Sequence, residues 1–145
     1  MSDVLTLSQI RVPGTARTKD DAIREAGEML VEAGAVTPAY IDSMFERERS
    51  VSTYMGNYLA IPHGTNESKE SIKRSALSVI RYDQPIDWDG NEVRFALGIA
   101  GYQGGHMDIL SRVAIVFSDT DEVDKLLAAG SAEEIYDILN AVNEE

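Results

Sequence analysis

The sequence predicts an α/β fold built on a mixed β-sheet that carries helices on both faces. Segments with strand and helix character follow one another in the order strand, two helices, three strands, three helices, which favours one sheet covered on both sides. An Asp-Gly turn between the two best strands excludes a purely parallel sheet. No repeat, low-complexity tract or linker-like composition interrupts the 145 residues, so we expect a single domain over 1–145.

The first half of the chain predicts one strand and two helices. Apolar residues make 4–10 a weak strand. Thr18 can cap a helix whose apolar residues recur every three or four positions until Gly34, which ends it. Thr37-Pro38 repeats the start signal, and this second helix is expected to end near Arg49-Ser50. The residues expected to be buried on it are Tyr40, Ile41, Met44 and Phe45.

The second half predicts three strands and three helices. A short apolar run stops at Pro62, and two longer runs rich in strand-forming residues come after it. Turn-forming residues at 87–91 join the longer runs, and Ser131 opens a capping box. The expected strands cover 58–61, 76–82 and 93–100, and the expected helices cover 106–117, 121–129 and a segment from Ser131.

Composition and charge restrict the class of protein. Hydrophobic residues make up 43% of the chain and charged residues 26%, which is typical of soluble globular proteins. There is no cysteine, no signal-peptide pattern, and no apolar stretch of the roughly 18–20 residues that cross a bilayer. The net charge of −12 disfavours nucleic acid and anionic lipid, because the chain cannot gain affinity by releasing their counterions. We therefore expect a cytoplasmic protein without membrane insertion.

His63 stands where a predicted buried strand ends. Pro62 before it restricts the backbone, and Gly64 after it leaves room for a bulky group to approach. A histidine in this setting is either presented to solvent for chemistry or is a turn residue without a function. The local pattern alone leaves both interpretations open.

His106 is the only other histidine, and it opens a predicted helix after a glycine-rich loop. Free N–H groups and the positive end of the helix dipole favour anions at this place. A neutral His106 could therefore donate an N–H to a phosphoryl oxygen, although an ordinary first-turn histidine is the alternative.

Three other chemistries fit the sequence poorly. The glycines before His106 lack G-x-G-x-x-G spacing, and no Walker lysine comes after them. The two histidines are 43 positions apart and form no metal-binding pattern, and no G-x-S-x-G elbow marks a hydrolase. We expect neither a cofactor nor a metal.

The segment GNYLAIPHGT, from Gly56 to Thr65, resembles the enzyme IIA family of the sugar phosphotransferase system, mannitol–fructose type. That family carries a glycine, two free positions, an apolar residue, alanine, an apolar residue and then Pro-His-Gly. Arg47-Glu48 precedes the histidine at the family distance, and LGIA at 97–100 leads into HMDIL at 106–110 like the family's second histidine segment. The resemblance covers nearly the whole chain, and the PIDW turn at 85–88 looks more like mannitol than fructose members.

The resemblance implies a three-layer α/β/α sandwich and a phosphotransferase component that carries phosphate for mannitol uptake, without a cofactor. His63 would be phosphorylated on its tele nitrogen, Nε2. His106 would contact the phosphoryl group and Arg47 would stabilise its charge. The donor would be the phosphocarrier protein HPr, and the acceptor would be a cysteine of enzyme IIB, part of a mannitol transporter with IIB and IIC subunits. Gly104-Gly105 departs from the charged or amide-rich loop of the family, which leaves the contacts of that loop open.

Three rival interpretations stand beside this one. A regulatory relative of the family would use the same phosphohistidine as a signal and feed no transporter. A hydrolase or metal-binding domain would use both histidines, and a pure binding module would never be phosphorylated. Tyr54, Met55 and Tyr58 are expected either in a partner-binding patch around His63 or in the core.

Overall fold

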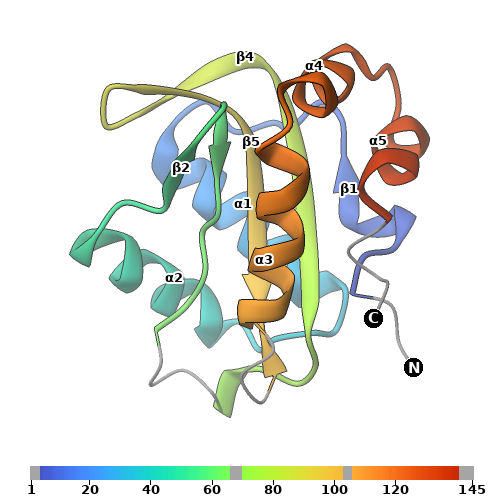
Figure 1. Ribbon diagram of the computed structural model, residues 1–145. Helices are drawn as coiled ribbons and strands as arrows, with labels where there is room; N and C mark the ends of the chain where they lie inside the picture. Colours follow the sequence, from blue (N-terminus) through green and yellow to red (C-terminus); the bar gives the residue numbers. More distant parts are fainter. Residues whose placement is uncertain (1–3, 66–69, 103–105, 141–145) are drawn as a thin grey trace.

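The computed structural model describes residues 4–65, 70–102 and 106–140, and it shows a five-stranded sheet flanked by helices (Figure 1). The strands are β1 (Ile10–Arg11), β2 (Tyr54–Gly56), β3 (Leu59–Ala60), β4 (Ala76–Trp88) and β5 (Asn91–Ala100). The helices are the 3-10 turn η1 (Leu7–Gln9), α1 (Lys19–Glu32), α2 (Ala39–Ser50), α3 (His106–Phe117), α4 (Thr120–Ala128) and α5 (Ala132–Leu139). Within these described ranges, no helix combines the length and apolarity that crossing a bilayer requires.

The sheet is mixed, as the sequence predicts. Its strand order is β1-β4-β5-β3-β2. β1 is parallel to β4 and β3 is parallel to β5, whereas β4 is antiparallel to β5 and β2 to β3. The β4–β5 hairpin turns at Asp89 and Gly90, whose φ angles of 55° and 93° suit an Asp-Gly pair. Gly90 N–H donates to the Asp87 carboxylate at 2.8 Å, which closes the turn.

Alternate residues of β5 enter two separate hydrophobic cores, because successive side chains of a strand point to opposite faces. Phe95, Leu97 and Ile99 belong to a core shared with α3, α4 and α5. Ala96 and Ala100 belong to a second core shared with α1 and α2. In Figure 1, α3 crosses in front of β4 and β5 while α1 lies behind them. The predicted three-layer α/β/α sandwich is therefore confirmed.

Close contact at Gly98 brings α1 onto the sheet. A Cβ at this position would lie 2.5 Å from Ser78 Oγ and 3.1 Å from the carbonyl oxygen of Ala26 in α1. The Ser78 hydroxyl donates to that same carbonyl at 2.9 Å. Glycine is thus required here for steric reasons, and the small residues of β5 on this face let helix and sheet approach closely.

The helix signals in the sequence are confirmed, except at the start of α2. Thr18 accepts from Asp21 N–H at 3.2 Å, and Ser131 accepts from Glu134 N–H at 3.2 Å, so both predicted caps form. The cap residue of α2 is Pro38, and no side chain caps this helix. The residues buried on α2 are Tyr40, Ser43, Met44 and Glu48, while Ile41 and Phe45 are only half-buried.

The strands differ more from the sequence-based prediction. The structure adds β2, which pairs with β3 across a turn at Asn57 and Tyr58, both with positive φ. The expected strand over 4–10 is instead a 3-10 turn followed by the two residues of β1. β4 continues through 83–88, beyond the expected end of that strand, because its partner β5 pairs with it again from Ile86 onward.

Candidate functional site

His63 lies where the chain leaves the sheet just beyond β3. Ile99 N–H of β5 donates to the carbonyl of Pro62 at 3.1 Å, and His63 forms a parallel bridge with Ile99. Pro62 is buried and His63 is half-buried. The strand pairing therefore fixes the backbone up to the histidine and releases it immediately afterwards.

The imidazole of His63 is held by its own backbone. Its Nδ1 lies 2.8 Å from the carbonyl oxygen of Ile61. A carbonyl oxygen can only accept, so in this contact Nδ1 carries the proton and donates it. Nε2 of the neutral ring then carries the lone pair, which makes it the nucleophilic atom.

Two side chains of α2 hold the backbone that comes after His63. Gly64 N–H donates to the Tyr40 hydroxyl at 2.9 Å, and Thr65 N–H donates to Ser43 Oγ at 2.8 Å. The sequence predicts Tyr40 only as a core residue, and it does not single out Ser43. Their spacing of three residues, which puts both on one face of a helix, was the available signal.

Arg47 lies on that same face, one turn beyond Ser43, in the last turn of α2. Its Nη1 donates to the carbonyl of Val51 at 2.9 Å, and the residue is half-buried. Tyr40, Ser43 and Arg47 thus share one face of α2: the two hydroxyls hold the loop after His63, and the guanidinium contacts the carbonyl of Val51.

His106 is the first residue of α3, as the sequence predicts. β3 and β5 are parallel, so the chain segments that leave their carboxyl ends, to His63 and to α3, emerge at the same edge of the sheet. The topology therefore brings the start of α3 to the edge where His63 lies. The side chain of His106 and the loop with Gly104-Gly105 lie outside the described residues.

A buried carboxylate supports the segment that leads to His63. Glu48 is 6% exposed and accepts from Thr53 N–H at 2.9 Å, from the Thr53 hydroxyl, and from Trp88 Nε1 at 3.1 Å. Thr53 in turn accepts Ile61 N–H at its carbonyl, at 3.1 Å. Glu48 thus links the end of α2 to the strand that carries the histidine, a role that the sequence does not predict for it.

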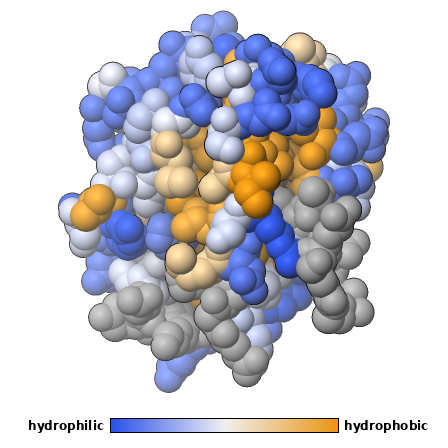
Figure 2. Space-filling view, in the orientation of Figure 1, coloured by the Kyte–Doolittle hydropathy of each residue, from blue (hydrophilic) through white to orange (hydrophobic). Residues whose placement is uncertain are grey.

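Several large apolar side chains of the described residues are exposed, and Val51 and Ile115 are the most exposed among them. Met55 and Tyr58 are 46% and 38% exposed, but Tyr58 precedes β3 by one residue and lies about 15 Å along the strand from His63. Tyr54 packs against the core under α1 and α2. Tyr102, two residues after β5, and Met107, in the first turn of α3, are exposed apolar residues that follow the carboxyl end of β5, toward the edge of His63. Figure 2 shows the apolar surface of this face gathered around α3 and bordered by hydrophilic residues.

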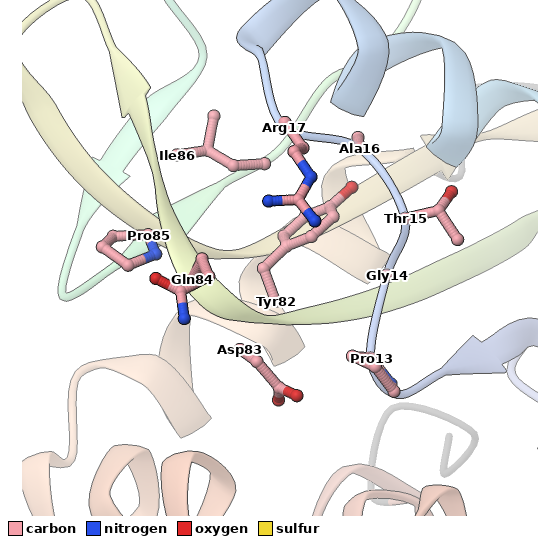
Figure 3. A pocket seen from close by; sticks show the side chains of 10 residues that line it. All are labelled: Pro13, Gly14, Thr15, Ala16, Arg17, Tyr82, Asp83, Gln84, Pro85 and Ile86. Atoms are coloured by element: carbon pink, nitrogen blue, oxygen red, sulfur yellow. The ribbon is translucent and has the colours of Figure 1, made fainter.

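A hollow of about 730 Å³ lies at the other end of the sheet, between residues 13–17 and residues 82–86 of β4 (Figure 3). It sits beside the hairpin end of β5, where Ile86 pairs with Val93, whereas His63 pairs with Ile99. Six residues of strand span roughly 20 Å, so this hollow is separate from the histidine. Among the described residues, no group of three or more His, Cys, Asp or Glu is placed to bind a metal ion.

Glu25 of α1 organises the wall of that hollow. Its buried carboxylate accepts from Thr15 N–H at 2.9 Å, from Arg11 Nη1 at 2.8 Å, from the Tyr82 hydroxyl at 2.8 Å and from Ala16 N–H at 3.1 Å. Burial alone would raise the pKa of Glu25, but these four donors outweigh it and lower the pKa to about 2.

The site and the fold together describe an α/β protein whose half-buried His63 imidazole lies where the chain leaves the edge of a mixed sheet. A model of the family "Phosphoenolpyruvate-dependent sugar phosphotransferase system, EIIA 2" matches residues 3–142. The mannitol-specific phosphotransferase enzyme IIA component of Halalkalibacterium halodurans is 52% identical over 141 residues, covering 97% of both chains.

Solved structures agree with this assignment. The crystal structure of IIA mannitol from Escherichia coli aligns with a TM-score of 0.86 at 30% identity, over 93% of this chain and 98% of that chain. The IIAMTL chain in the Escherichia coli complex of enzyme IIAMTL with phosphorylated enzyme IIBMTL aligns with a TM-score of 0.87 at 29% identity, over 93% and 96%. The chain belongs to the EIIA 2 family and is a component of the phosphoenolpyruvate-dependent sugar phosphotransferase system.

The low pKa of Glu25 predicts acid sensitivity of the fold. A lowered carboxyl pKa stabilises the folded state above the ordinary value of 4.5, and this stabilisation is lost as the pH falls from about 5 toward 2. Glu25→Gln should lower the free energy of unfolding at pH 7 by on the order of 2 kcal/mol, a figure that is reduced for solvent screening at the partly exposed Arg11. The difference in stability between the variant and the wild type should shrink below pH 4. Denaturant unfolding at several pH values measures this. Glu28→Gln, on the exposed face of α1, is the control, and an equal, pH-independent loss in both variants would contradict the prediction.

Proposed function

We propose that this protein carries a phosphoryl group on Nε2 of His63 between the phosphocarrier protein HPr and the enzyme IIB of a mannitol transporter. The observation that carries the proposal is the 2.8 Å contact of Nδ1 with the Ile61 carbonyl. It leaves Nε2 as the nucleophile and fixes the ring before any partner arrives. The edge position of His63 on the sheet supports access by a second protein.

In the first transfer, the lone pair of Nε2 attacks the phosphorus of phosphohistidine on HPr. A new N–P bond forms on His63 as the N–P bond of the donor breaks, and the bonding pair returns to the donor imidazole. Positive charge grows on the ring of His63 during this step. The Nδ1–H group donates a hydrogen bond to the Ile61 carbonyl oxygen, and this bond stabilises the positive charge on the ring.

In the second transfer, a cysteine thiolate of enzyme IIB attacks the same phosphorus. An S–P bond forms, the Nε2–P bond breaks, and His63 regains its lone pair. This chain contains no cysteine, so the thiolate belongs to the partner. The Escherichia coli relative whose structure was solved in complex with phosphorylated enzyme IIB supports this acceptor.

Arg47 and His106 complete the proposed site. Transfer of a phosphoryl group depends mainly on placement and on stabilising charge at the equatorial oxygens. A guanidinium can meet two of those oxygens at once, and Arg47 lies on the face of α2 that holds the His63 loop. His106 opens α3 at the same sheet edge, where its ring N–H could reach a third oxygen.

The proposed setting is the cytoplasmic side of mannitol uptake. Mannitol is the substrate named for the 52% identical relative and for the Escherichia coli structures. Tyr102 and Met107, exposed at the His63 edge, suit a small and transient protein interface. A purely regulatory role of the same phosphohistidine would be indicated if the protein accepted phosphate but passed none to enzyme IIB.

His63→Ala should abolish phosphorylation, because it removes the nucleophile. The wild-type protein, incubated with enzyme I, HPr and phosphoenolpyruvate, should gain one acid-labile phosphate that peptide mass spectrometry maps to His63. The half-buried position of His63 predicts that the variant keeps its fold, which thermal unfolding can check. Full labelling of His63→Ala would end the proposal.

Arg47→Ala should slow both transfers by roughly ten- to a hundredfold, because the charge of the transition state loses a donor. Arg47→Lys should recover only part of the rate, since an ammonium lacks the two-pronged geometry. Arg49→Ala is the matched control, because Arg49 is exposed in the same last turn of α2 but on another face. Single-turnover reactions quenched at successive times measure the rates of both transfers. Equal losses at positions 47 and 49 would show a general charge effect and refute a specific role of Arg47.

His106→Ala should still accept phosphate from HPr but should pass it to enzyme IIB roughly a hundredfold more slowly, the usual size of effect when one oxyanion donor is removed. The phosphorylated variant is isolated and chased with unlabelled enzyme IIB. An unchanged rate of onward transfer would remove His106 from the mechanism.

A further inference from the structure

A tyrosine hydroxyl occupies the point where the strand pairing beside His63 ends. In a parallel ladder, residue His63 paired with Ile99 is flanked by two hydrogen bonds. The first joins Ile99 N–H to the Pro62 carbonyl at 3.1 Å. The second would join Gly64 N–H to the Ile99 carbonyl. The Tyr40 hydroxyl contacts both of these groups, at 2.9 Å from Gly64 N and 2.7 Å from the Ile99 oxygen.

The hydrogen-bond directions at Tyr40 are fully determined. A backbone N–H only donates and a carbonyl only accepts, so the hydroxyl accepts from Gly64 and donates its one proton to Ile99. Tyr40 is 2% exposed, which keeps water from replacing either bond. Burial raises the pKa of Tyr40 to about 12, although the Gly64 N–H acts in the opposite direction. The hydroxyl therefore stays protonated across the physiological range.

We propose that Tyr40 is a positioning residue for phosphoryl transfer. Its hydroxyl bridges Gly64 N–H and the Ile99 carbonyl, keeps these two groups from bonding directly, and so fixes the position of His63. This inference rests on the proposed function of His63. Ser43 lies one turn further along α2 and holds the next residue of the loop in a similar way, because its hydroxyl accepts a hydrogen bond from Thr65 N–H at 2.8 Å.

The physical reason is that a small movement of Gly64 also displaces the reacting nitrogen of His63. Gly64 is bonded directly to His63, and the ring of His63 is tied to the backbone of Ile61. A backbone shift at Gly64 is therefore passed to Nε2. Without the Tyr40 oxygen, Gly64 N–H can move toward the Ile99 carbonyl and close the ladder. An in-line transfer is sensitive to displacements of about 1 Å, which can cost up to a hundredfold in rate.

Tyr40→Phe tests this inference, because it removes one oxygen and keeps the ring that fills the core. Single-turnover phosphorylation by phospho-HPr is followed over a range of HPr concentrations. The limiting rate should fall roughly ten- to a hundredfold, while the HPr concentration at half-saturation should stay within about twofold. Ser43→Ala should lower the limiting rate in the same direction by a smaller factor.

Tyr82→Phe is the matched control. Tyr82 is 1% exposed and loses a single buried bond, to Glu25 at 2.8 Å, at the far end of the sheet. It should lose thermal stability yet keep the wild-type transfer rate, so a rate loss confined to Tyr40→Phe separates positioning from stability.

The outcomes are distinct. If wild type is labelled at His63 and Tyr40→Phe is as fast as Tyr82→Phe, the positioning role is refuted and the proposed function stands. If Tyr40→Phe is too unstable to assay, Ser43→Ala decides. A wild-type transfer rate in Ser43→Ala would refute the idea that side chains of α2 position His63 through the loop that follows it. If wild type itself gains no phosphate on His63, the proposed function fails and this inference falls with it.

Discussion

The parallel pairing of the β3 segment with β5 is the constraint on which the site depends. The pairing extends from the Phe95 N–H bond to the Tyr58 carbonyl at 2.9 Å, through the β3–β5 ladder, to the Ile99 N–H bond to the Pro62 carbonyl at 3.1 Å. Because the two segments run in the same direction, their carboxyl ends lie at one edge of the sheet. One segment delivers His63 to that edge, and the other delivers the first turn of α3. An antiparallel arrangement would have put them at opposite ends.

The sequence predicted the helical layers better than the sheet. Helix ends carry local signals, and Thr18 and Ser131 cap as expected because the residues that they bind lie three positions away. β1 and β3 have only two residues each, and β2 has three. Such strands exist through pairing with distant partners rather than through their own composition, so a short sequence window carries little trace of them.

At the site, the sequence indicated the histidine but not its support. The Pro-His-Gly segment singles out His63 because proline and glycine act locally on the backbone, but the local pattern left a turn residue as the alternative, and only the family resemblance indicated a phosphorylated histidine. Tyr40, Ser43 and Glu48 act on segments 5 to 24 positions away in the chain, and their polar atoms do not change an apolar period. The apolar period therefore places Tyr40 in the core, correctly, but it carries no information about the partners of its hydroxyl. The role of the α2 face that Tyr40, Ser43 and Arg47 share can be recognised only from the fold, which brings Tyr40 and Ser43 into contact with the loop after His63.

The ring of His63 is oriented by a carbonyl only two residues before it, within the same strand exit. Under the proposed function, the orientation is consequently independent of whichever protein is docked, and donor and acceptor must each approach one and the same nitrogen from solvent. Two bulky proteins cannot do so together. Turnover must then alternate between two binary complexes, in a double-displacement cycle, and rapid release of each partner matters as much to flux as the chemical steps.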